Sequence, residues 1–99
     1  MDNVENKGDN LELQLFVSGM SARSMQAINN IKQICTEHLV GKCNLEIIDI
    51  YKNPELASKY QIVFSPSLIK QYPLPRRTLI GTLSNKAKVM ENLGIVSKK

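Results

Sequence analysis

The chain has 99 residues, of which 42% are hydrophobic and 22% are charged, the composition of one ordinary globular domain. The net charge of +4 is unevenly spread: residues 1–50 hold four Lys and Arg against seven Asp and Glu, and residues 51–99 hold nine against two. No apolar stretch approaches the roughly 18 residues that a membrane span needs, and the basic residues are not interleaved with aromatics. We expect no membrane and no nucleic acid as partners, and the basic half fits an acidic protein surface better.

Residues 1–10 are polar and acidic, unlike the positively charged start of a secretory signal peptide. We expect this segment to be a disordered lead to a single domain over residues 11–94, followed by a short basic tail over residues 95–99. The expected location is cytoplasmic, where cysteines stay reduced.

Few residues could hold a metal or carry redox chemistry. Cys35 and Cys43 are eight residues apart, which fits no metal-binding or redox motif. Cys35 falls on an apolar helix face and is expected to be a core residue. His38 is the only histidine and has no ligand partner at a suitable spacing. We therefore expect no metal site and no cofactor.

The first half of the chain alternates clearly between strand and helix patterns. A period-two pattern of Leu11, Leu13, Leu15 and Val17 predicts a strand over 11–17. Ser21 can cap a helix over 22–39, whose apolar face is formed by Met25, Ile28, Ile31, Cys35 and Leu39. A second strand over 44–50 follows, and the long helical crossover implies that the two strands are parallel.

The second half has shorter signals. Asn53-Pro54-Glu55 predicts the start of a short helix that ends near Tyr60. Brief apolar runs at 62–64, 67–69 and 78–80 are cut by prolines, and Ser84 can cap a last helix with Ala87, Met90 and Leu93 on one face. The order β-α-β-α-β-β-α is that of a thioredoxin-like α/β fold. Pro66 stands where such folds usually place a cis-proline, although the sequence alone leaves its isomer open.

A thioredoxin-like enzyme needs a reactive thiol at the N-terminus of its first helix. The corresponding segment, Gly19-Met20-Ser21-Ala22-Arg23-Ser24, contains no cysteine, and the serines lack an identifiable general base. We expect the chain not to be an enzyme. One alternative stays open: a thioredoxin-like protein that has lost its redox activity, or carries its nucleophile elsewhere, and that binds another partner.

Several short motifs together resemble the KaiB family. They extend over about residues 11–94 without a gap, and their combination is far more specific than any one of them. The motifs are Phe16-Val17-Ser18-Gly19, Ser21, Ser24, Ala27, Asn30-Ile31, Ile48-Asp49-Ile50, Lys52-Asn53-Pro54, Leu56-Ala57, Pro66-Ser67-Leu68-Ile69-Lys70, Pro73, Pro75, Arg77, Ile80-Gly81 and Leu83-Ser84.

The resemblance implies a non-catalytic regulatory protein that binds the ring-shaped ATPase KaiC, in circadian or in stress and environmental signalling. In the oscillator such proteins also sequester KaiA and displace a thioredoxin-like sensor kinase domain. The family is known for two folds, a thioredoxin-like monomer and a tetramer with the order β-α-β-β-α-α-β. A homo-oligomer, dimer or tetramer, is therefore expected. A related sensory domain of thioredoxin-like fold is the other alternative.

The resemblance also indicates residues for partner binding, and it shows departures. The basic residues Lys70 and Arg77 are retained, and Arg76 adds to the same basic region. Gln61 stands where oscillator proteins carry a lysine for KaiC. Asn92 and Gly94 stand where Gly and Asp are common. Gln26 and Glu46 replace basic residues used toward KaiA, so we do not expect KaiA to be a partner.

Overall fold

The structure is a computed structural model that describes residues 10–39 and 41–95. The lead expected over 1–10 and the tail expected over 95–99 lie almost wholly outside the described residues. Seven elements follow one another: β1 (Leu11–Val17), α1 (Ala22–His38), β2 (Cys43–Asp49), α2 (Pro54–Lys59), β3 (Ser67–Tyr72), β4 (Arg77–Ile80) and α3 (Lys86–Leu93). This is the predicted thioredoxin-like order and not the alternative β-α-β-β-α-α-β order.

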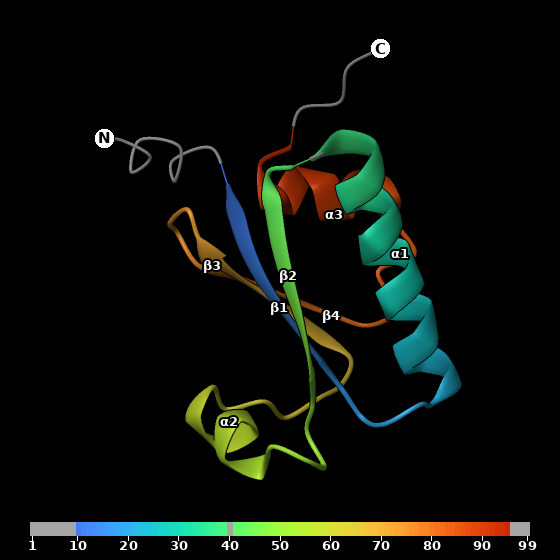
Figure 1. Ribbon diagram of the computed structural model, residues 1–99, viewed down its shortest axis with the longest axis vertical. Helices are drawn as coiled ribbons and strands as arrows, with labels where there is room; N and C mark the ends of the chain where they lie inside the picture. Colours follow the sequence, from blue (N-terminus) through green and yellow to red (C-terminus); the bar gives the residue numbers. More distant parts are fainter. Residues whose placement is uncertain (1–9, 40, 96–99) are drawn as a thin grey trace.

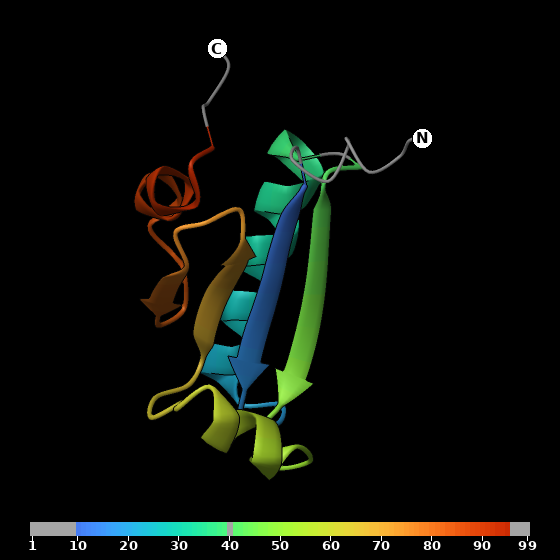
Figure 2. The ribbon, with the colours of Figure 1, turned by 90° about the vertical axis from the view of Figure 1, so that its left-hand side faces the viewer.

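The four strands form one sheet in the order β2-β1-β3-β4. β1 and β2 are parallel, joined by the α1 crossover, and β3 is antiparallel to both β1 and β4. Helices α1 and α3 lie on one side of the sheet and α2 lies on the other, at one end of it (Figure 1). The view onto the face of the sheet shows α1 running behind the strands and α2 across their lower ends (Figure 2).

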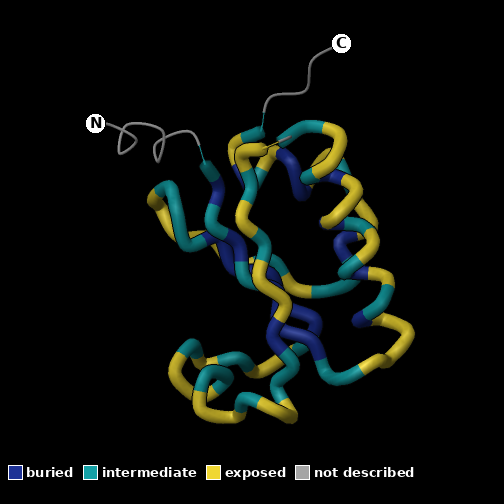
Figure 3. The backbone as a smooth tube through the Cα atoms, in the orientation of Figure 1, coloured by how far each residue is buried: buried dark blue, intermediate teal, exposed yellow. Residues whose placement is uncertain are grey.

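The core follows from the alternation of β1, because successive side chains of a strand point to opposite faces. Its four aliphatic residues at odd positions pack against α1 and α3. Phe16 points to the other face, where it meets Ile48 and Ile69, and α2 covers this smaller cluster with Leu56. The buried segments accordingly concentrate in the middle of the sheet (Figure 3). Fully burying one such side chain stabilises the fold by roughly 1.5–3 kcal/mol.

The helix predictions were right in type and slightly wrong in detail. The buried residues of α1 are Ser24, Ala27, Ile31 and Ile34, whereas Ile28, Cys35 and Leu39 of the predicted face are only partly buried. The small side chains of Ser24 and Ala27 are as fully buried as those of Ile31 and Ile34, a role that a pattern of large apolar residues does not indicate.

The last helix begins two residues later than Ser84. Asn85 caps α3, since its Oδ1 accepts a hydrogen bond of 3.2 Å from the amide of Lys88. The Ser84 hydroxyl instead lies 2.6 Å from that of Thr82. Val89, rather than the predicted Ala87, joins Met90 and Leu93 in the core.

The segment before β3 contains the cis peptide bond that the sequence left open. The Ser65–Pro66 bond is cis, as are Tyr72–Pro73 and Leu74–Pro75 in the hairpin between β3 and β4. Pro66 is fully buried beside the first residue of β3. The cis-proline position of thioredoxin-like folds is thus occupied here.

Candidate protein-interaction surface

The turn between β1 and α1, where thioredoxin-like enzymes hold their thiols, is used for structure. Ser21 caps α1, and the buried Ser24 hydroxyl accepts a hydrogen bond of 3.1 Å from the amide of Ser18. The Asp49 carboxylate accepts hydrogen bonds from the amides of Gly19 (3.3 Å) and Tyr51 (2.9 Å). These polar groups satisfy one another and leave no activated nucleophile.

A shallow groove opens beside the cis-proline segment. It has a volume of about 370 Å³ and is lined by Tyr60, Gln61, Ile62, Val63, Phe64, Ser67, Ile69, Thr78 and Ile80. We call it the α2–β4 groove. Val63 is 79% exposed, and Phe64 and Ile80 are each 61% exposed. Contiguous exposed apolar side chains of this size are typical of protein contact sites.

Basic side chains border the α2–β4 groove. The guanidinium of Arg76 lies 6.0 Å from the centroid of the Tyr60 ring, and the ammonium of Lys59 lies 5.5 Å from the same centroid. A cation at this distance is attracted to the face of an aromatic ring. Arg77, the first residue of β4, is exposed and follows Arg76 in the chain, but Thr78 and Ile80 are the β4 residues that line the groove, so Arg77 belongs to the other face of the strand. An apolar floor with a basic rim suits a partner that presents apolar side chains next to carboxylates.

The structure divides the six predicted binding residues into three groups. Gln61 lines the α2–β4 groove with a left-handed backbone (φ 55°), Arg76 lies at its border beside Tyr60, and Arg77 follows Arg76 on the other face of β4. Asn92 and Gly94 lie at the C-terminal end of α3, at the other end of the molecule from α2 (Figure 1).

Lys70 forms the third group and corrects the sequence-based expectation. It lies in the middle of the sheet on β3, paired with Leu13 of β1, and is only 5% exposed. Its ammonium group is therefore not part of the exposed surface in this conformation, because β3 is an inner strand.

Val63, Phe64 and Ile80 were not predicted to be surface residues. Their apolar runs indicated strands, and residues 62–64 instead form the exposed segment before the cis-proline. A signal was present, since Val63 and Phe64 come three and two positions before Pro66, and a proline is unfavourable inside a regular strand.

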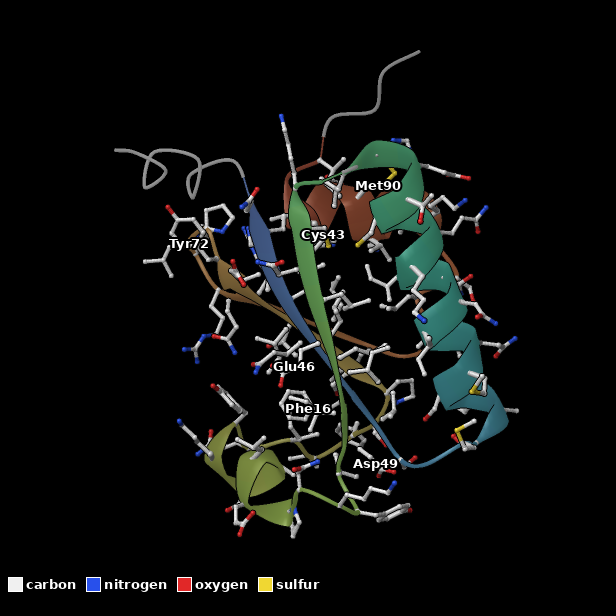
Figure 4. The ribbon with its side chains drawn as sticks, viewed as in Figure 1. Phe16, Cys43, Glu46, Asp49, Tyr72 and Met90 are labelled. Atoms are coloured by element: carbon white, nitrogen blue, oxygen red, sulfur yellow. The ribbon has the colours of Figure 1, made fainter. Side chains whose placement is uncertain are left out.

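The sheet face next to α2 carries a separate, acidic region near the β2 edge. Gln71 donates to the Oε1 of Gln14 (2.7 Å), and Gln14 in turn donates to the Oε1 of Glu46 (3.2 Å). Glu46 and Phe16 lie on the same side of the sheet (Figure 4), but α2 covers only Phe16. Asn44 donates to the Glu12 carboxylate (3.0 Å) nearby.

Within residues 10–39 and 41–95, none of the helices has the length and hydrophobicity of a membrane span. No three His, Cys, Asp or Glu side chains in the same ranges are grouped so that they could hold a metal ion.

Comparisons with known proteins agree with this geometry. The family model of the KaiB domain matches residues 14–95. Circadian clock protein KaiB3 from Synechocystis sp. is 46% identical over 84 residues, covering 85% of this chain and 82% of the relative. Circadian clock oscillator protein KaiB from Synechococcus elongatus is 38% identical with the same coverage.

Solved structures show the same fold. The N-terminal domain of Synechococcus elongatus SasA superposes with a TM-score of 0.70 at 27% identity, covering 87% of this chain and 85% of that one. Chloroplastic thioredoxin z superposes with a TM-score of 0.73 at 21% identity, covering 87% and 77%. The likeness to thioredoxins is one of fold.

Proposed function

The chain belongs to the KaiB family, and we propose that it is a non-catalytic regulatory protein that binds a KaiC-type ATPase through the α2–β4 groove. The observation that carries this proposal is the exposure of Val63, Phe64 and Ile80 in a groove that Arg76 borders. Large apolar side chains in a concave site next to arginines are the usual composition of an energetically dominant contact region. The process is circadian timing or stress and environmental signalling.

A non-catalytic role is supported by the turn at residues 19–24. It holds hydroxyl groups that hydrogen-bond within the fold, where a redox enzyme needs a thiol with a lowered pKa. The chain thus offers a thioredoxin-like scaffold whose neighbouring surface is used for binding.

KaiA is not among the proposed partners. Glu46 lies near the β2 edge of the sheet, in an acidic region with Glu12, and Gln26 is an uncharged exposed residue of α1. A partner suited to basic residues at these positions meets like charge at Glu46.

We further propose a cytoplasmic location and a homo-oligomer, dimer or tetramer, in the absence of a partner. The exposed apolar side chains of the α2–β4 groove support self-association, because association removes them from water. Light scattering across a dilution series measures this directly, and a monomer at every concentration contradicts it.

The binding proposal is tested by titrating the chain with the KaiC-type ATPase of the same genome. We expect Phe64→Ala together with Val63→Ala to weaken binding by about tenfold or more, as for truncation of dominant contact residues. Met20→Ala is the matched control, because Met20 is 78% exposed and does not line the groove. Equal losses in both variants, or no binding by the unaltered chain, contradict the proposal.

A thioredoxin-like sensory domain remains the second candidate, favoured by the superposition on the SasA domain. Both candidates have a thioredoxin-like surface, so a competition experiment is needed to separate them. A chain that acts as a KaiB-type protein competes with the SasA domain for the ATPase, whereas an unrelated sensory domain does not.

A further inference from the structure

Cys35 and Cys43 lie on either side of the turn that joins α1 to β2. Cys35 belongs to the last turn of α1, and Cys43 is the first residue of β2. The backbone turns sharply between them: the amide of Leu39 donates to the carbonyl of Cys35 (3.0 Å), and the amide of Lys42 donates to that of Leu39 (2.8 Å). The fold therefore places the two residues together, although no motif spacing indicates it.

The two thiols share one environment. Both are free and half-buried, and both pack against the hydrophobic cluster between the sheet and α1. They line the same pocket, of about 280 Å³, together with Thr36, Leu39 and Gly41. This pocket gives a small solute access to both sulfur atoms, on the side of β2 where Figure 4 shows Cys43.

The thiols also differ in acidity. A hydrogen bond from Cys43 lowers the pKa of Cys35, although burial acts in the opposite direction. The same hydrogen bond and burial raise the pKa of the Cys43 thiol. Cys35 is thus the group that ionises first, and Cys43 keeps its proton next to it. The C-terminal end of a helix disfavours a thiolate, so the reactivity of Cys35 is moderate compared with a thiol at a helix N-terminus.

We propose that Cys35 and Cys43 form a redox-modification site at which hydrogen peroxide produces an intramolecular disulfide. The Cys35 thiolate attacks one peroxide oxygen, the O–O bond breaks, and after proton uptake Cys35 carries a sulfenic acid and one water leaves. The Cys43 sulfur then attacks the sulfenic sulfur, the S–O bond breaks, and a second water leaves with the Cys43 proton. Two thiols are oxidised and one peroxide is reduced to two waters.

The disulfide ties the end of α1 to the start of the edge strand β2. It closes only the short loop from Cys35 to Cys43, and it lies at the end of the sheet opposite α2 (Figure 1). The α2–β4 groove is therefore unaffected by the modification, and the inference does not depend on the partner proposed above.

The test exposes the reduced full-length chain to hydrogen peroxide and follows its mass and its alkylatable thiols. We expect a monomeric product that has lost two hydrogen atoms, at a rate independent of protein concentration, and formed faster in the folded chain than in urea. Glutathione at the same thiol concentration in a parallel reaction serves as the reference thiol. Three results would each overturn the proposal. They are an intermolecular disulfide, thiols that stay intact after the glutathione is consumed, and an equal rate in urea.

Two serine variants test the assigned roles. Cys43→Ser should stop at a sulfenic acid on Cys35 that dimedone captures. Cys35→Ser leaves only Cys43, whose pKa burial still raises, so Cys43 in this variant should react with peroxide more slowly than Cys35 does in Cys43→Ser. If Cys43 in Cys35→Ser reacts as fast as Cys35 in Cys43→Ser, the assigned roles are wrong. If a variant does not fold, peptide mapping of the unaltered chain still decides whether the Cys35–Cys43 bond forms.

Discussion

Ser21 and Ser24 hydrogen-bond to each other twice: the amide of Ser24 donates to the Ser21 hydroxyl oxygen (3.2 Å), and the Ser21 hydroxyl donates to that of Ser24 (2.9 Å). The Ser24 oxygen also accepts from the amide of Ser18. Two hydroxyl groups thus join the end of β1 to the start of α1, in the turn where a redox enzyme of this fold carries thiols.

Removing the Ser24 hydroxyl should destabilise the fold. Ser24→Ala leaves the Ser18 amide without its partner in a partly buried turn, which costs about 1–3 kcal/mol of unfolding free energy. Urea denaturation measures the change, with the exposed Ser58→Ala of α2 as the control. A loss no larger than that of Ser58→Ala shows that the Ser24 hydrogen bonds contribute nothing.

The chain should not reduce disulfide substrates. No thiol lies at residues 19–24, and the Cys35–Cys43 pair lies at the other end of α1, where a thiolate is disfavoured. In an insulin-reduction assay we expect the uncatalysed rate, with a thioredoxin as the positive control. Catalysis that disappears in Cys35→Ala contradicts a non-catalytic role.

Charge reversal at the start of β4, near the α2–β4 groove, should slow association with an acidic partner. Arg77→Glu removes an exposed cation of β4 that attracts the partner before contact, so we expect an association rate about three- to tenfold lower at low salt. The difference should shrink as salt screens the charges. Lys88→Glu, an equal charge change on α3, is the control. Identical rates for the two variants mean that Arg77 has only a solvated surface role.

Restoring positive charge near the β2 edge should improve binding to a KaiA. In the double variant Glu46→Lys and Gln26→Arg, we expect tighter binding because a like charge is removed and attraction is added. The two residues lie on different faces of the sheet, so Glu46→Lys alone should account for most of the gain. Binding of the unaltered chain as tight as that of oscillator proteins contradicts the interpretation of these departures.

Residues 61–94 should open more readily than residues 11–50. Strand β3 is the informative element, because Ser67–Lys70 are buried in the middle of the sheet. If 61–94 opens as a unit, the amides of β3 exchange together with those of β4 and α3, through openings below the global unfolding free energy. If only the edges fray, β3 stays as protected as β1. Hydrogen exchange distinguishes the two, and the second result contradicts a fold change of this half.

Much of the fold was determined by local pattern. The alternation from Leu11 to Val17, the helical period of residues 22–38 and the long crossover required a parallel pair with a helix on one face. The absence of a thiol at residues 19–24 led us to expect no thioredoxin chemistry, because that chemistry needs a particular atom at a particular helix end. Such conclusions depend on the neighbours of a residue along the chain, which a sequence shows directly.

Contacts between distant segments were decided only by the tertiary structure. Lys70 appeared to be a surface cation until the order of the strands placed β3 inside the sheet. Val63 and Phe64 had the pattern of a buried strand, yet they remain exposed because the chain turns at the cis-proline before it joins the sheet. The eight-residue spacing of Cys35 and Cys43 matches no motif, and only the turn after α1 brings their thiols together. Burial and proximity depend on what packs against a residue from elsewhere in the chain, and no local pattern contains that information.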